Sequence, residues 1–421
     1  MNVSVVNLGC KVNRVESDTI AAAYLQNGAE LTDARDADII VVNTCTVTEE
    51  AEKKTRKTLR KLLRENAHAS LLVTGCAATI NPDFYACLDE RIELVDKHEL
   101  LSTELHGIEQ LAKHPLVRVG SYFPTRVGIK VQDGCNHSCT YCIVHVARGK
   151  AWSRPFHLIA KEVCQLAEQG VKELVLSGID LGSYNFTDEV SDKRYNLSEL
   201  ILRLLDLLDS KGFSDTRLRI SSIEPRSVKK DFVQVLARSE GRVCRHLHLP
   251  LQSGSSRVLA EMNRPYTAPD FLSLVAYLKE SVGDLSLTTD IIVGFPGETD
   301  QDFDQTYQLA QEVGFSKIHV FRYSKRAGTP AALRDDQIPA KVKEVRAHAL
   351  LELSDELRYR YALRNKDRKE RIVVEQRGWG MSESYYKIHL DDSYKPGSVI
   401  ESCLVQSVEL EGDLSWMKQS K

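Results

Sequence analysis

The stretch Asp133-Gly-Cys-Asn-His-Ser-Cys-Thr-Tyr-Cys142 places three cysteines, Cys135, Cys139 and Cys142, at C-x3-C-x2-C spacing in one short segment. A [4Fe-4S] cluster takes four ligands, so a loop that supplies three thiolates leaves one iron open for a substrate or cofactor. Gly134 lets the backbone come close to such a cluster. A structural zinc site is the competing interpretation, but zinc usually takes a second cysteine pair downstream, and none follows. The spacing therefore favours a cluster over zinc.

This loop resembles the cluster-binding loop of the radical S-adenosylmethionine (SAM) enzymes, including the aromatic Tyr141 directly before the last cysteine. In that superfamily the open iron chelates the amino and carboxylate groups of SAM, and an electron from the cluster cleaves SAM to a 5′-deoxyadenosyl radical. The resemblance implies that the cofactor carries the chemistry while the protein positions it. Tyr141 is accordingly expected beside the cofactor.

The composition predicts a soluble protein of several domains. At 421 residues, a prior of about 150 residues per domain suggests two or three domains. The start lacks a basic n-region, and no apolar run approaches the ~20 residues of a membrane span, so we expect a cytoplasmic protein without a membrane partner. Ten cysteines then indicate metal ligation or redox chemistry. The net charge of −3 confines any polyanion site to a local patch.

Residues 1–115 alternate short, β-branched apolar runs with helix-like stretches. The predicted elements are Val3–Leu8, Glu16–Gln26, Asp38–Asn43, Glu49–Glu65 and Leu71–Thr74. This alternation predicts an α/β fold with a flavodoxin-like parallel sheet, whose ligands gather outside the carboxyl ends of the strands.

Three cysteines, Cys10, Cys45 and Cys76, directly follow the three predicted strands. Each alone is most simply a small buried hydrophobic side chain. Because all three fall at one edge of one sheet, together they favour a second three-thiolate cluster site.

A second βα series occupies residues 121–350. Its predicted strands are Val127–Gln132, Glu173–Ser177, Leu218–Ser222, His246–Leu249, Leu287–Val293 and Lys317–Arg322. Six strands with intervening helices predict a partial (βα)6 barrel, in which chemistry sits at the carboxyl ends of the strands. The cysteine loop follows the first of these strands.

Small and polar residues at these strand ends are candidate cofactor contacts. Glycines such as Gly178 and Gly294 allow a cofactor close to the backbone, and hydroxyl and carboxylate groups offer hydrogen bonds. Each of these residues alone is weak evidence for a cofactor site, since glycine also occurs simply because it closes turns. The candidates are Ser177, Gly178, Ser222, Glu224 and Gly294. Of the alternating His246 and His248, we expect only one to face the barrel interior.

Residues 351–421 complete the chain. A charged helical stretch runs from Pro339 to about Arg371, followed by alternating runs with turn glycines. These runs predict a small antiparallel β-barrel, and they are Ile372–Glu375, Ser384–Leu390, Ser398–Glu401 and Leu404–Leu410.

The two cysteine triplets and the three-part layout together resemble the methylthiotransferases. That family combines an amino-terminal α/β domain holding an auxiliary [4Fe-4S] cluster, a radical SAM barrel and a carboxyl-terminal TRAM domain that binds RNA. Gly9–Asn13 and Val41–Thr48 are most similar to the MtaB branch. Further matching stretches are Arg148-Gly149 with Ser153–Pro155, His246–Ser255 with Met262–Arg264, and Thr289–Thr299.

The resemblance implies a reaction and its partners. The MtaB branch converts N6-threonylcarbamoyladenosine at tRNA position 37 to its 2-methylthio derivative with two SAM molecules and two [4Fe-4S] clusters. It implies that Cys135, Cys139 and Cys142 hold the SAM-cleaving cluster, and that Cys10, Cys45 and Cys76 hold the cluster carrying the sulfur. The implied partners are the tRNA anticodon loop, an external electron donor such as flavodoxin or ferredoxin, and a sulfur donor. No general acid or base is assigned.

Three other functions remain open at this stage. A sister branch modifies isopentenyladenosine and typically has Gln-Met where this chain has Lys11-Val12. A third branch methylthiolates an aspartate of ribosomal protein S12. A cluster-bearing RNA-binding protein without turnover would have decayed cofactor motifs in the barrel.

A run of basic residues on the helix after Cys45 is the candidate RNA surface: Lys53, Lys54, Arg56, Lys57 and Arg60. A solvated helix face explains an isolated charge run equally well. The run begins near the expected cluster edge, where an RNA backbone must approach.

Overall fold

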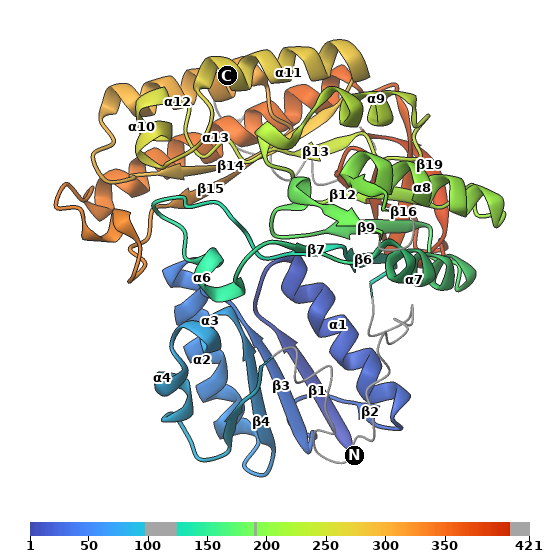
Figure 1. Cartoon of the computed structure of the whole chain (residues 1–421), viewed down its shortest axis with the longest axis vertical. Coiled ribbons are helices and arrows are strands. Elements are labelled where there is room, and N and C mark those ends of the chain that lie inside the picture. Colours follow the sequence, from blue (N-terminus) through green and yellow to red (C-terminus); the bar gives the residue numbers. More distant parts are fainter. Residues whose placement is uncertain (97–123, 189–191, 405–421) are drawn as a thin grey trace.

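The computed structural model describes residues 1–96, 124–188 and 192–404. Its amino-terminal part is a parallel sheet flanked by helices, shown in blue in Figure 1. The sheet has the order β2-β1-β3-β4-β5, which is the flavodoxin-like order predicted from the sequence. Its strands are β1 (Asn2–Asn7), β2 (Glu30–Leu31), β3 (Ile39–Thr44), β4 (Ser70–Gly75) and β5 (Ile92–Leu94).

Among the described residues, four helices accompany this sheet: α1 (Lys11–Gln26), α2 (Glu49–Glu65), α3 (Cys76–Ile80) and α4 (Pro82–Ala86). Every residue of β3 is buried, as expected of a central parallel strand covered on both faces. The Thr48 side chain caps α2 by accepting a hydrogen bond from the backbone of Ala51. Three glutamates in the first turn favour the same start through the helix dipole.

The central part is the predicted partial barrel of six parallel strands. One half consists of β6 (Arg126–Lys130), β9 (Glu173–Ser177) and β12 (Arg217–Ile220), and the other of β13 (His246–His248), β14 (Ser286–Val293) and β15 (Lys317–Arg322). Backbone hydrogen bonds join the halves, including one of 2.8 Å from Cys244 N to Leu218 O. The cysteine loop is flanked by a two-stranded ribbon, β7 (Gln132–Asp133) and β8 (Trp152–Ser153).

Helices cover the outside of this barrel, and Figure 1 shows them around the green and yellow strands. They are α7 (Phe156–Glu168), α8 (Leu197–Ser210), α9 (Lys230–Arg238), α10 (Ser256–Glu261), α11 (Ala268–Val282) and α12 (Asp300–Val313). The short α6 (Val144–Arg148), which follows the cysteine loop, contacts α3 of the amino-terminal part instead. The short strands β10 (Asn185–Thr187) and β11 (Arg194–Asn196) form a separate hairpin. In the described ranges, no helix is both long enough and apolar enough to cross a membrane.

The amino-terminal part packs against the open side of the barrel between β6 and β15. Helix α1 lies so close to β6 that a side chain on Gly128 would put its Cβ 2.2 Å from Val15 Cγ2. At the other edge, Glu49 N donates to Ser324 Oγ at 3.0 Å, and Arg326 pairs with Glu52 at 2.6 Å. The carboxyl ends of the sheet strands therefore face the barrel opening.

The carboxyl-terminal part begins with α13 (Ala340–Arg364), which packs along β15. A four-stranded antiparallel sheet follows in the order β18-β17-β16-β19, made of β16 (Lys369–Gln376), β17 (Trp379–Ser382), β18 (Lys387–His389) and β19 (Val399–Cys403). The predicted run Leu404–Leu410 lies almost entirely outside the described residues, as does the expected division of the chain between residues 115 and 121. The other expected division, at residue 350, falls within α13.

The helix prediction was wrong over its last turns. The expected helix to Arg371 ends at Arg364, and the charged residues from Lys369 onward begin β16. Glu370 points inward there and accepts hydrogen bonds from Ser384 N at 3.0 Å and Ser384 Oγ at 2.7 Å. Two hydrogen bonds to one carboxylate oxygen, with Arg368 3.6 Å from the other, stabilise Glu370 at this buried strand position.

The carboxyl-terminal sheet covers the amino-terminal end of the barrel. Arg219 of β12 donates to Ser382 O at 2.8 Å and to Glu383 O at 3.0 Å, and Arg217 donates to Arg371 O at 2.7 Å. This packing brings the turn between β17 and β18 under the barrel interior.

Candidate active site

A cavity of about 680 Å³ runs through the barrel interior, and all three parts of the chain line it. The amino-terminal part contributes Cys10 and Lys11, the barrel contributes the cysteine loop and the strand ends, and the carboxyl-terminal sheet contributes Tyr385. This placement agrees with the rule that parallel α/β sheets bind ligands at the carboxyl ends of their strands.

The three cysteines of the loop lie together on the cavity wall. Each sulfur accepts a hydrogen bond at a distance of 3.4 Å. The donors are His137 N for Cys135, Val144 N for Cys142 and Arg264 Nη1 for Cys139. Burial raises the pKa of Cys135 to about 12 and that of Cys142 to about 11. The thiolates therefore need a bound cation for their stability, and donors to sulfur are typical of cluster sites.

Gly134 gives the loop its conformation. Its φ is 71°, and a Cβ added there would lie 2.1 Å from the backbone oxygen of Lys150. Only glycine fits so close an approach of two backbone segments in a left-handed conformation. The structure thus requires glycine at position 134 for the packing of the loop against Lys150, and the predicted approach of this backbone to a cluster stays a prediction.

The strand-end triplet forms a second group of thiols. Cys10 is exposed to the cavity, whereas Cys45 and Cys76 are buried. Burial, with the charges of Cys10 and Cys76, raises the pKa of Cys45 to about 11. The Cys76 charge also contributes to the raised pKa of Cys142 after burial and other causes, so the two triplets are electrostatic neighbours.

A buried ionic network joins the strand-end triplet to Asp133, which precedes the cysteine loop. The Arg148 guanidinium pairs with Glu16 at 3.0 Å and with Asp133 at 2.9 Å, and it donates to Asn13 Oδ1 at 3.0 Å. Burial raises the pKa of the Cys76 thiol, and the charge of Arg148 and its hydrogen bond to this thiol partly offset the increase. Arg148 follows the cysteine loop in the chain, so the network fixes the position of this loop relative to α1.

Several buried polar atoms on the cavity wall have no hydrogen-bond partner within the described ranges. They include Asp180 Oδ1, Ser221 Oγ and Glu224 Oε1. Unsatisfied buried acceptors are costly in a folded protein unless a ligand or water completes them. Their position beside the cysteine loop fits the ammonium and hydroxyl groups of SAM, just as the thiols fit a cluster.

Four of the six predicted cofactor contacts line the cavity, namely Tyr141, Gly178, Ser222 and Glu224. The structure places Ser177 and Gly294 away from it. The Ser177 hydroxyl is buried and donates to Val175 O at 3.2 Å. Gly294 packs against the Lys343 side chain and donates its N–H to Glu298 Oε2 at 2.6 Å. The side chain of Ser177 and the backbone of Gly294 therefore contact other protein groups and do not line the cavity.

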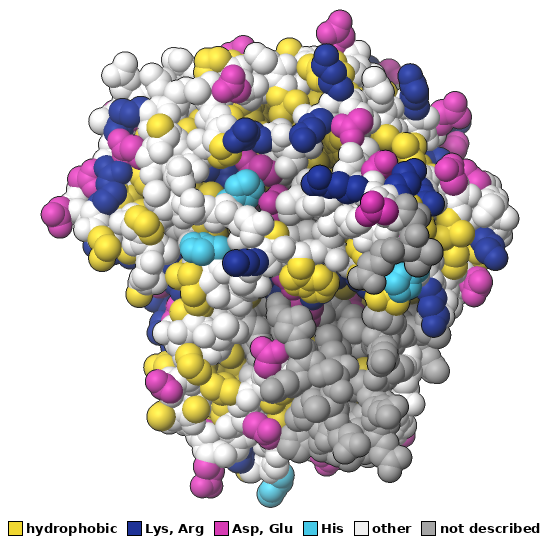
Figure 2. Space-filling model, viewed as in Figure 1, with side chains coloured by type: hydrophobic (Ala, Val, Ile, Leu, Met, Phe, Trp, Pro, Cys, Tyr) yellow, Lys and Arg dark blue, Asp and Glu magenta, His cyan; other side chains and the backbone are white. Residues whose placement is uncertain are grey.

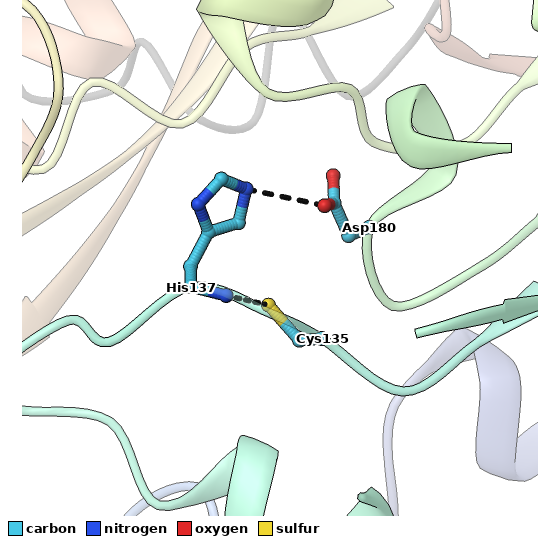
Figure 3. Close-up of side chains that lie close together, drawn as sticks. All are labelled: Cys135, His137 and Asp180. Atoms are coloured by element: carbon cyan, nitrogen blue, oxygen red, sulfur yellow. Dashed lines mark hydrogen bonds and ion pairs between the residues drawn. The ribbon is translucent and has the colours of Figure 1, made fainter. Parts of the chain in front are cut away.

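Sequence reasoning did not assign His137 and Asp180 to the site. Figure 3 shows the His137 ring turned from the cysteine loop toward Asp180, which follows β9, and the His137 Nε2 to Asp180 Oδ2 distance is 3.1 Å. With Cys135 they bring three metal-ligating atoms within 4.8 Å of one another. The position of Asp180, three residues beyond a strand end, was the available signal.

The prediction for His246 and His248 was wrong. Both line the cavity, and each ring places a nitrogen 2.9 Å from Thr288 Oγ1. Residues at i and i+2 of a strand share one face, so both side chains point inward.

The predicted RNA surface lies on α2, which begins at the cavity wall beside Val47 and Thr48. Lys53 pairs with Glu49 at 2.7 Å, and Arg56 pairs with Glu52 at 3.7 Å and lies over the Phe84 ring. Lys54, Lys57 and Arg60 are exposed, and no ion pair involves them in the described parts of the chain. Figure 2 shows basic and acidic side chains interspersed over the barrel on the face in view.

Two protein families match this chain, one over the barrel and the other over the amino-terminal part. Residues 129–310 match the radical SAM superfamily, and residues 2–95 match a family described as uncharacterized protein family UPF0004. The structure of TsrM, a radical SAM methyltransferase from Kitasatospora setae, has a TM-score of 0.55 at 15% identity, over 79% of this chain and 77% of that one. That likeness supports the fold.

Curated relatives extend over almost the whole chain. The threonylcarbamoyladenosine tRNA methylthiotransferase MtaB of Bacillus subtilis is 37% identical, over 92% of this chain and 88% of its own length. MtaB of Thermotoga maritima is 34% identical, over 98% and 96%. A tRNA-2-methylthio-N(6)-dimethylallyladenosine synthase of Thermodesulfovibrio yellowstonii is 30% identical, over 98% of both. With a radical SAM core and such relatives, this chain belongs to the radical SAM methylthiotransferase family and is an enzyme that uses SAM and a [4Fe-4S] cluster.

Proposed function

We propose that this enzyme transfers a methylthio group to carbon 2 of N6-threonylcarbamoyladenosine at position 37 of tRNA, using SAM and two [4Fe-4S] clusters. The observation that carries the proposal is that the loop triplet and Cys10 line one cavity, while the charge of the neighbouring Cys76 acts on Cys142 of the loop. One triplet serves radical formation and the other serves sulfur delivery. The relatives named MtaB, at 33–37% identity, support the choice of nucleoside.

In this proposal the loop residues Cys135, Cys139 and Cys142 hold the cluster that binds SAM. When bound there, SAM supplies the methyl group and, on reductive cleavage, a radical that can activate an unreactive aromatic carbon. Asp180 and Glu224 offer carboxylate oxygens to its polar groups. Tyr141 and Gly178 shape the adjoining wall.

Cys10, Cys45 and Cys76 hold the second cluster, which carries the sulfur to be delivered. Three thiols leave one metal position open under the four-ligand rule. Arg148 hydrogen-bonds the Cys76 thiol and is fixed by Glu16 and Asp133. It therefore holds the two cluster sites at a constant separation. An external electron donor and a sulfur donor complete the proposed cycle.

A second candidate substrate is dimethylallyladenosine at the same tRNA position. Relatives named for that nucleoside are 30–35% identical to this chain, which overlaps the range of the MtaB relatives. The two substrates differ chemically, since a threonylcarbamoyl group carries a carboxylate and a dimethylallyl group carries none.

Nucleoside analysis of tRNA from cells lacking the gene tests the proposal. We expect the 2-methylthio derivative of threonylcarbamoyladenosine to disappear and threonylcarbamoyladenosine to accumulate, with both changes reversed by the wild-type gene. Persistence of that derivative, with loss of the methylthiolated dimethylallyl nucleoside or of the modified S12 aspartate, would contradict it.

The α2 surface gives a prediction about RNA affinity. Reversing charge at Lys54, Lys57 and Arg60 together is expected to weaken tRNA binding by about 10-fold or more, because each cation lost removes a phosphate contact. The salt dependence of log K should become shallower by about 2 to 3 for the three charges. Filter binding across a salt series measures both quantities.

A matched control reverses Lys229, Lys230 and Arg238, which are exposed at α9 on the outside of the barrel. This control should leave both tRNA affinity and its salt dependence as in the wild type. Equal effects of the two triple variants would show that total charge, and not the α2 surface, governs binding.

A further inference from the structure

One lysine that lines the cavity has no carboxylate partner among the described residues. Each of the other charged lining residues has a polar partner: Glu224 pairs with Arg264 and Arg322 with Glu50, and the imidazoles of His137 and His248 lie 3.1 Å from Asp180 and 3.2 Å from Asp290. Lys11 forms no such ion pair with any described carboxylate, and it is exposed to the cavity. The cavity therefore presents one uncompensated ammonium group.

Tyr385 holds this ammonium in place. The Lys11 Nζ lies 4.9 Å from the centroid of the Tyr385 ring, a cation–π distance. The same ring stacks on His246 with centroids 4.7 Å apart and planes 21° apart. Tyr385 has a φ of 68°, which is uncommon for an aromatic residue and reflects a position fixed by its contacts.

The groups around Lys11 do not neutralise it. Burial, with the charges of Arg219 and Lys11, lowers the pKa of His246 well below its ordinary value. Burial likewise lowers the pKa of His319 to about 4. Both imidazoles are therefore uncharged near pH 7. Arg126 and Arg219 lie 5.7 and 5.2 Å from the Tyr385 ring centroid and add positive potential.

A hydrogen-bonding atom accompanies the charge. His246 Nδ1 is buried and has no partner among the described residues, while its Nε2 contacts Thr288. A neutral imidazole in this position offers a ligand one further hydrogen bond. An unpaired cation and an unsatisfied imidazole nitrogen on one wall are the features of an anion site.

We propose that Lys11, positioned by Tyr385, forms a carboxylate-binding subsite that takes the threonyl carboxylate of the modified adenosine. This inference rests on the proposed function. In a threonylcarbamoyl group the amine of threonine is consumed by the carbamoyl linkage, which leaves the carboxylate free. Lys11 adjoins Cys10, so a base whose side chain is anchored there lies beside the proposed sulfur-carrying cluster. Lys11 is thus a specificity-determining residue.

The experiment measures binding of anticodon stem-loop RNA to the anaerobically reconstituted enzyme by fluorescence anisotropy, without SAM. Three RNAs are compared, carrying threonylcarbamoyladenosine, its carboxamide analogue or unmodified adenosine at position 37. For the wild type we expect the carboxylate to tighten binding about 10- to 100-fold over the carboxamide, as a charge-assisted hydrogen bond does. Lys11→Met should abolish this ratio without changing the affinity for the carboxamide RNA.

Lys11→Arg is the matched control, because it keeps the charge, and it should retain most of the ratio. Iron content and circular dichroism equal to those of the wild type establish that each variant is folded and loaded. A Lys11→Met variant that keeps the wild-type ratio would refute the subsite. Loss of SAM affinity with an unchanged ratio would also refute it, since the ammonium would then serve the SAM carboxylate.

The failure of this inference is separable from that of the proposed function. If the wild-type enzyme methylthiolates threonylcarbamoyladenosine and Lys11→Met keeps the ratio of carboxylate to carboxamide RNA affinity, only the subsite is refuted. If the wild-type enzyme leaves this nucleoside unmodified in tRNA, the proposed function is refuted, and the subsite with it.

Discussion

Replacing Cys135, Cys139 and Cys142 together with alanine is expected to abolish formation of 5′-deoxyadenosine and to lower the iron content from about eight to about four per chain. The three sulfurs line one wall of the cavity, and each receives a hydrogen bond from a neighbouring N–H group. Under the proposed function, no thiolates would then remain in the loop to hold the cluster that binds SAM. Iron analysis and chromatographic detection of 5′-deoxyadenosine measure the two effects.

The matched variant replaces Cys10, Cys45 and Cys76 with alanine. It should also hold about four irons, but it should still form 5′-deoxyadenosine and yield no methylthiolated nucleoside. The opposed behaviour of the two triple variants separates radical formation from sulfur delivery. A strand-end variant that keeps about eight irons would contradict the two-cluster proposal, and a loop variant that still cleaves SAM would contradict the assignment of the loop.

The cysteines could be predicted because they depend on backbone topology alone. Parallel strands end at one edge of a sheet, so Cys10, Cys45 and Cys76 converge whatever surrounds them. The loop from Cys135 to Cys142 carries its three cysteines within one segment, so its geometry is local. Both predictions needed only strands of the correct order, and alternating apolar runs supply that order.

Side-chain direction was harder to predict than strand position. Ser177 ends β9 as expected, yet its hydroxyl turns back to Val175 O, while Gly178 and Asp180 beyond it reach the cavity. Gly294 follows β14 but contacts Lys343 and Glu298. Where the chain leaves a strand, one residue of displacement changes the face that a side chain occupies.

Tyr385 could not be placed from sequence at all. It lies some 140 residues beyond His246 in the chain and reaches the His246 ring only because the carboxyl-terminal sheet packs under the barrel. Long-range packing of this kind leaves no periodic signal in a single sequence. The charged start of β16 misled the helix prediction for a related reason, since tertiary contacts of Glu370 override local propensity.

The packing beneath the barrel depends on one carboxylate. Glu173 is fully buried, and its oxygens lie 2.5 Å from Arg219 Nε, 2.6 Å from Arg217 Nη2 and 3.4 Å from Arg126 Nη1. Burial opposes its ionisation, but the guanidiniums of Arg219, Arg217 and Arg126 outweigh burial and hold the pKa of Glu173 well below its usual range. Arg217 and Arg219 also donate to backbone oxygens of the carboxyl-terminal sheet, and Arg126 pairs with the Glu375 side chain, so Glu173 links barrel and sheet.

Glu173→Gln is therefore expected to lower the free energy of unfolding by about 3–5 kcal/mol, because it leaves buried guanidiniums without their counter-charge. Chemical denaturation near neutral pH measures the loss. Glu375→Gln is the control, since Glu375 is partly exposed and pairs with Arg126, and it should cost about 1 kcal/mol or less. The depressed pKa fixes the pH dependence: the Glu173 contribution is present above its ordinary pKa of 4.5 and is lost as pH falls through the lower folded value. The difference in stability between wild type and Glu173→Gln should then stay constant from neutral pH down to about pH 5 and shrink below it. A difference of less than about 1 kcal/mol at neutral pH would mean that the arginines are held by the sheet carbonyls without Glu173.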